Sequence, residues 1–120
     1  MSALLDFGDM CLDYIIYDIG SAGAYACMGQ EIDHAQTVAA IIAGYDPSMP
    51  REVVEVVYAA ALGRGLLSYL MATERMVSEP DSEYLAHTAK PGMESARKHL
   101  KYKSLEQAVD AIMGILADKS

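Results

Sequence analysis

The residues best suited to chemistry are Glu31 and His34, which stand in a Glu-x-x-His pattern. On a helix this spacing puts a carboxylate and an imidazole on one face, as in helical bundles that hold two metal ions. Such sites need two of these pairs and two further glutamates, whereas this chain has one pair. A metal site would therefore require a symmetric dimer. The missing carboxylate would come from Asp9, Asp13, Glu55 or Glu74.

A structural role for Glu31 is the other interpretation, with Arg64 or Arg75 as its partner. Residues 1–50 contain seven acids and no Lys or Arg, so an acid that turns inward there needs a cation from later in the chain. Arg64 is the cation nearest the middle of the longest apolar stretch, and an unpaired buried carboxylate is strongly destabilising. We therefore expect Arg64 to be at least half buried and to form a structural ion pair, with Glu31 as the candidate acid.

Groups for other kinds of catalysis are missing from the sequence pattern. Ser68 has no histidine at helical spacing, and His87 and His99 stand near no cysteine, so nothing indicates a nucleophilic triad. The glycines at positions 20 and 23 lack the preceding strand and following lysine of a phosphate-binding loop. We expect a protein that binds rather than an enzyme, with no cofactor.

Composition points to one cytoplasmic domain spanning residues 1–120. A chain of 120 residues that is 52% hydrophobic can bury one sizeable core. No basic segment precedes an apolar run at the start, and Glu55 and Arg64 interrupt the most apolar stretch, which argues against a signal peptide and a membrane span. Two cysteines cannot form a disulfide framework, so we expect reduced thiols, although a single Cys11–Cys27 disulfide stays open.

The periodicity of apolar residues predicts an all-α fold, a bundle of four to five helices around a long central helix at about residues 50–78. That stretch has no turn signal, and Ala59, Gly63, Ala61 and Gly65 would let a neighbouring helix approach near Arg64. Earlier helices are expected at 3–19 and 24–43, separated by a break at 20–23, with Ser48 capping the central helix.

After the central helix we expect a less regular region, residues 79–103, with a turn at Lys90-Pro91-Gly92 and a short basic helix from about 93 to 102. Ser104 and Gln107 match a capping box, which predicts the start of a last helix. This helix carries a regular apolar stripe. The stripe consists of Leu105, Ala108, Val109, Ile112, Met113 and Leu116.

A candidate partner-binding surface lies on the predicted first helix, where three acids form a stripe beside an arc of large apolar and aromatic side chains. Exposed arcs of this kind mark contact surfaces. The acids are Asp6, Asp9 and Asp13, and the arc consists of Phe7, Met10, Tyr14 and Tyr17.

The net charge of −8 and its concentration in the first half disfavour direct binding of nucleic acid, because phosphates need cations. The sequence favours a small acidic interaction protein, an adaptor or an inhibitor, that binds a basic protein surface and forms a homo-oligomer, such as a homodimer, through leftover apolar surface. Two alternatives remain, a metal-binding helical bundle assembled across a dimer and a structural assembly subunit.

Overall fold

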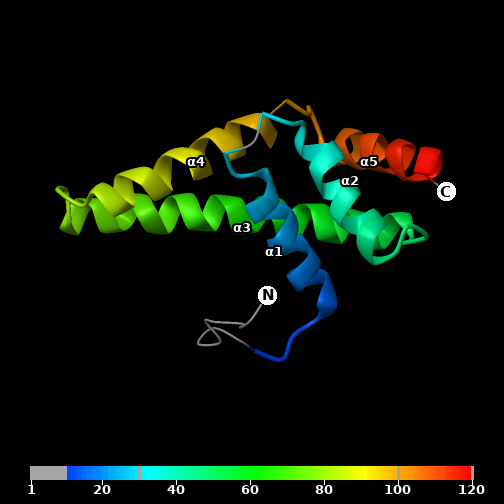
Figure 1. Ribbon diagram of the computed structural model, residues 1–120, viewed down its shortest axis with the longest axis horizontal. Helices are drawn as coiled ribbons and strands as arrows, with labels where there is room; N and C mark the ends of the chain where they lie inside the picture. The colour runs from blue at the N-terminus through cyan, green and yellow to red at the C-terminus, as the bar shows by residue number, and fades with distance from the viewer. Residues whose placement is uncertain (1–10, 30, 100, 120) are drawn as a thin grey trace, which may run out of the picture.

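The computed structural model describes residues 11–29, 31–99 and 101–119, and within these residues it contains five α-helices and no strand (Figure 1). The predicted all-α class is confirmed, and so is the long central helix. The helices are α1 (Ile15–Cys27), α2 (His34–Tyr45), α3 (Arg51–Ser78), α4 (Glu83–His99) and α5 (Leu105–Lys119).

Helix α3 begins directly after Pro50, whose fixed φ of −60° suits a helix start. Ser48 was the predicted cap, but its backbone N–H and its hydroxyl both donate to the Asp46 carboxylate, at 2.9 and 2.6 Å. Ser48 therefore shapes the turn between α2 and α3 and does not cap α3. At the other end, the chain leaves the helix at Glu79, and Pro80 prevents its continuation.

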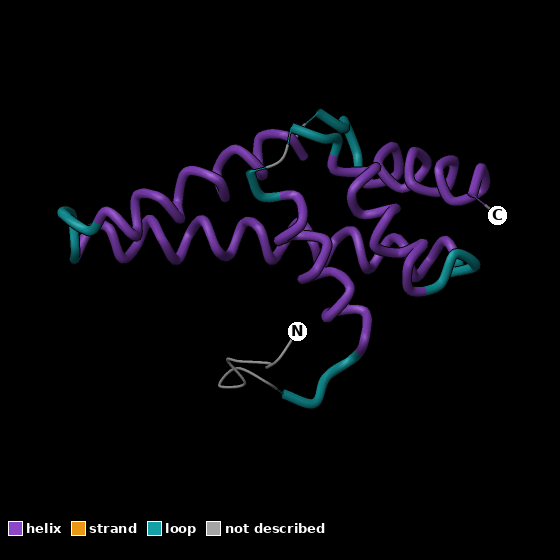
Figure 2. The backbone as a smooth tube through the Cα atoms, in the orientation of Figure 1, coloured by secondary structure: helices purple, strands orange, loops and turns teal. Residues whose placement is uncertain are grey.

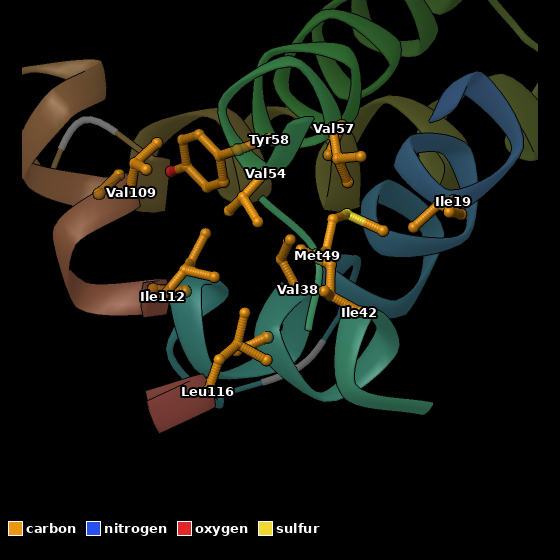
Figure 3. Close-up of a cluster of buried hydrophobic side chains, with 14 of the residues drawn as sticks. Ile19, Val38, Ile42, Met49, Val54, Val57, Tyr58, Val109, Ile112 and Leu116 are labelled. Atoms are coloured by element: carbon orange, nitrogen blue, oxygen red, sulfur yellow. The ribbon is translucent and has the colours of Figure 1, made fainter. Parts of the chain in front are cut away.

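The hydrophobic core lies where α1, α2 and α5 surround the N-terminal half of α3 (Figure 3). We call these three helices together with residues 51–61 of α3 the head. Side chains from all four helices are fully or almost fully buried there. Figure 3 labels Ile19, Val38, Ile42, Met49, Val54, Val57, Tyr58, Val109, Ile112 and Leu116.

Helix α1 crosses α3 at very short range, which corrects the predicted break at residues 20–23. Gly20 and Gly23 are buried inside α1, and a Cβ atom at Gly20 would lie 2.7 Å from Cβ of Ala60 and 3.1 Å from the carbonyl oxygen of Val57. Glycine is needed at position 20 because of this approach, not because the chain turns. The turn comes later, around Gly29, where φ is +71°.

The remaining part of the molecule is a helical hairpin, in which α4 packs against the C-terminal half of α3 (Figure 2). We call α4 and residues 65–78 of α3 the arm. The predicted turn at Lys90-Pro91-Gly92 is wrong, because α4 runs through Pro91. Gly92 explains the packing there, since a Cβ at this position would lie 3.3 Å from Cβ of Tyr69 on α3. In the figure the arm runs to one side, away from α2 and α5.

The last helix starts as its capping residues predict. The backbone N–H of Gln107 donates to the Ser104 hydroxyl at 3.1 Å, and the Gln107 side-chain oxygen accepts from the backbone N–H of Lys103 at 2.9 Å. The apolar stripe of α5 then packs onto α2 and α3. Its most buried members are Ala108, Val109, Ile112 and Leu116.

Among the described helices, α3 alone is long and apolar enough to cross a membrane, with a mean hydropathy of 1.4 over its most apolar window. Core helices of soluble proteins pass the same test, so this property by itself does not decide between the two environments.

Candidate protein-interaction surface

The start of α1 carries an exposed group of aromatic and acidic side chains. Tyr14 is the N-terminal flanking residue of α1, and its backbone N–H donates to the Asp13 carboxylate at 2.7 Å. The rings of Tyr14 and Tyr17 meet edge to face, with centroids 6.4 Å apart and an interplanar angle of 62°. Asp18 lies in the first turn and is also exposed. These side chains form one polar and aromatic surface, here called the α1 surface.

The α1 surface continues to Tyr25, which is 53% exposed and lies beside α3. Arg64 donates to the Tyr25 hydroxyl at 2.6 Å, and its guanidinium carbon lies 5.5 Å from the centre of the ring. The expected ion pair between Arg64 and Glu31 is therefore wrong: both side chains are exposed, and within the described chain no ion pair joins them. An exposed acid needs no cation, because water solvates it.

Of the partner-binding residues predicted from the sequence, Asp6, Phe7, Asp9 and Met10 lie outside the described residues. Asp13, Tyr14 and Tyr17 are exposed, as such a role requires, but Asp13 precedes the helix instead of lying within it. The sequence analysis missed Leu12, Ile15 and Tyr25, which are also exposed. Leu12 precedes α1 and Ile15 is its first residue, whereas the sequence placed the start of this helix twelve residues too early.

Acidic charge dominates this half of the molecule. Described residues 11–50 contain five acids and no Lys or Arg. Of these acids, Asp33 has a cation as its partner, Lys101, which lies between α4 and α5. The other four keep their charge unpaired within the described chain. They are Asp13, Asp18, Glu31 and Asp46.

Asp33 is a structural residue that joins α2 to the segment between α4 and α5. Its carboxylate caps α2 by accepting from the backbone N–H of Ala35 at 2.9 Å, and it also accepts from the Tyr102 hydroxyl at 2.6 Å and from the Lys101 ammonium group. Burial alone would raise the pKa of Asp33, but these three bonds prevail and lower it to about 2.

The predicted metal ligands Glu31 and His34 do not share a helical face. Glu31 is exposed in the turn before α2, whereas His34 is the first residue of that helix and 2% exposed. Burial and the nearby Lys98 lower the pKa of His34. Both residues border an open groove of about 240 Å³ that Lys98 and Lys101 also line. No group of three or more metal-binding side chains forms among the described residues. The geometry therefore gives the metal hypothesis no support.

Of the two cysteines, Cys11 and Cys27, the buried Cys27 is not suited to nucleophilic chemistry in this fold. Both are free thiols, which answers the question of a Cys11–Cys27 disulfide. Cys27 lies near Asp33, but its thiol is buried, and burial raises its pKa to about 11 even though Thr37 hydrogen-bonds to it. A reactive cysteine needs an accessible thiolate at neutral pH. Cys27 is instead a core residue.

Comparison of the chain with protein-family models, with curated proteins and with solved structures finds no match.

Proposed function

We propose that this protein is a small acidic interaction module, of the adaptor or inhibitor type, that binds a basic protein surface through the α1 surface. The observation that supports this most is the combination of exposed Tyr14 and Tyr17 with the unpaired carboxylates of Asp13 and Asp18. Tyrosine supplies large contact area at low entropic cost, and it is enriched in protein interfaces.

Charge decides the class of partner. The four unpaired acids of residues 11–50 have no neighbouring Lys or Arg in that segment, so their field attracts a cationic surface and repels phosphates. Rim charges of this kind mainly speed association, whereas the tyrosine rings contribute area that is buried on contact. The two contributions are separable, because salt weakens the first much more than the second.

The test is capture of partners from an extract of the native host by the wild-type chain and by an Asp13→Lys/Asp18→Lys variant. The expected result is that a basic protein captured by the wild type is lost from the variant. Raising the salt concentration from about 0.15 to 0.5 M should also release it, because salt screens the charges.

The matched control is Asp81→Lys/Asp118→Lys, which changes net charge equally at exposed positions of the α3–α4 turn and α5. The control should retain the partner. If both variants lose the partner equally, the effect is one of net charge and not of the α1 surface. If both variants retain the partner, the α1 surface is not the binding site. Circular dichroism of each variant verifies that its helices are intact.

A further inference from the structure

One face of α3 carries a regular repeat that no element of the described chain covers. Seven positions follow one another at alternating steps of three and four residues, which is the spacing of a coiled-coil seam. Six of them are exposed, and the seventh, Thr73, is half-buried with its hydroxyl bonded to the carbonyl oxygens of Tyr69 and Leu70 in its own helix. We call this set the α3 seam. It consists of Val56, Ala59, Gly63, Leu66, Leu70, Thr73 and Val77.

The seam is free because the other sides of α3 are occupied. Gly20 of α1 lies against Ala60, on the edge of α3 next to the seam. Helix α4 lies against Gly65 and Tyr69. The seam faces away from the core and from α4, and along its edge run Leu67 and Met71, which are 47% and 52% exposed.

The seam exposes large apolar side chains, as the centres of protein interfaces do. Leu70 is 59% exposed and Val77 is 85% exposed, although both are apolar. Val56, Leu66, Leu67 and Met71 lie on or beside the same seam and are 39–52% exposed. A run of exposed apolar side chains along one helix face marks a binding surface. A helix with the same seam is the partner that fills it without leaving voids.

We propose that two copies of this chain pair along the α3 seam in an antiparallel coiled coil. In the middle of the seam, the small residues Ala59 and Gly63 precede the large residues Leu66 and Leu70. In an antiparallel pair, Gly63 faces Leu66 of the partner subunit and Ala59 faces Leu70 of the partner subunit, so the central layers each combine a small and a large side chain. A parallel pair would place Gly63 against Gly63, which leaves a gap, and Leu70 against Leu70, which crowds that layer.

A lipid bilayer is the competing occupant, and a charge near the middle of α3 disfavours it. Any stretch of α3 long enough to cross the membrane contains Arg64. Its guanidinium would be desolvated there, whereas in a coiled coil it keeps its exposed position beside Tyr25. Glu74 occupies a flanking position of the repeat, where charged residues are common.

The first experiment measures the mass of the full-length chain by sedimentation equilibrium over a range of concentrations. The wild type should reach twice the chain mass. Leu70→Glu should weaken the dimer by about 100-fold or more, because it puts an unpaired carboxylate into two layers of the interface. Tyr45→Glu is the matched control, since Tyr45 is 55% exposed at the end of α2 and is not a residue of the seam. It should leave the dimer unchanged.

The second experiment tests orientation. An Ala59→Lys chain mixed with the Leu70→Glu chain should give a mixed dimer, because the two substituted positions face each other in an antiparallel pair. Neither variant should dimerise alone at the same concentration.

Three results would overturn the proposal. The first is a wild-type chain that is monomeric up to about 100 μM, a concentration well above the Kd of most specific complexes. The others are a dimer that survives Leu70→Glu and a mixture of the Ala59→Lys and Leu70→Glu chains that forms no mixed dimer. Binding of the wild type, but not of Leu70→Glu, to phosphatidylcholine vesicles would assign the seam to a membrane instead. No residue of the seam belongs to the α1 surface, so this outcome leaves the proposed function intact, and the Asp13→Lys/Asp18→Lys variant should still dimerise.

Discussion

The two halves of α3 differ in burial although both are rich in apolar residues. In the head, Val54 and Val57 are completely buried because α1, α2 and α5 surround them. In the arm, α4 covers one side, and Leu70 and Met71 on the opposite side are more than half exposed. Burial therefore follows the number of neighbouring helices and not the hydrophobicity of the segment. The head should carry most of the free energy of unfolding, and the arm should open more readily.

The largest expected effect comes from a core change in the head. Ile112→Ala should lower the free energy of unfolding by about 2–5 kcal/mol, because Ile112 is fully buried and its removal leaves a cavity. The same kind of truncation in the arm, Leu70→Ala, should cost the monomer less than about 1 kcal/mol. Urea denaturation of dilute protein measures both values. Equal costs would contradict the division into head and arm.

An intermediate effect of opposite sign is expected for Pro91→Ala in α4. Proline inside a helix removes one backbone hydrogen bond and strains the preceding turn, at a cost of about 3 kcal/mol. The substitution should therefore stabilise the arm by about 1–2 kcal/mol, part of the gain being lost with the contacts of the half-buried ring. Amide hydrogen exchange should slow in α4 while α2 and α5 are unaffected. Slower exchange throughout the molecule would mean that head and arm unfold together.

An effect of similar size, but destabilising, is expected where the head meets the segment that follows α4. The folded pKa of Asp33 is about 2 against an ordinary value of 3.8. Because the pKa is depressed, the stabilisation is complete above pH 3.8 and is lost as the pH falls towards 2. Asp33→Asn should cost about 1–2 kcal/mol at pH 7, a value reduced for the 66% exposure of the Lys101 side chain.

Urea denaturation of wild type and variant at several pH values isolates this contribution, since other carboxyl groups titrate equally in both proteins. The difference between the two curves should shrink below pH 3.8. A constant difference would mean that Asp33 acts through packing and helix capping by its oxygen, and not through its charge.

Local signals in the sequence were sufficient where an element depends on its own residues. The central helix follows from 28 consecutive residues without an internal breaker. The start of α5 follows from Ser104, whose hydroxyl accepts from the backbone N–H of Gln107, and from the Gln107 side chain, which accepts from the backbone N–H of Lys103. The all-α class needed nothing further. These features are independent of which helix packs on which.

Prediction from the sequence failed where the role of a residue depends on a contact with a residue far along the chain. Glycine at position 20 looks the same in the sequence whether it ends a helix or admits another one, and only the approach of Ala60 distinguishes the two. Pro91 was taken as a turn because its local preference is strong, but packing of α4 on α3 overrides it. Arg64 binds the hydroxyl of Tyr25 and not an acid, because the acids of the first half are solvated. No local sequence pattern reveals which acids are solvated. The site residues at positions 6–10 stay predictions.

The thiols of Cys11 and Cys27 differ in exposure, so their rates of alkylation can report how often the core opens. Cys11 is exposed, so an alkylating reagent should modify it at the rate of a free peptide thiol. Cys27 is the last residue of α1 and is 1% exposed, so it should react only in molecules whose head has opened. Counting adducts by mass spectrometry over time therefore yields two rates from one unlabelled sample. The ratio of these rates measures how often the core is exposed to solvent under native conditions.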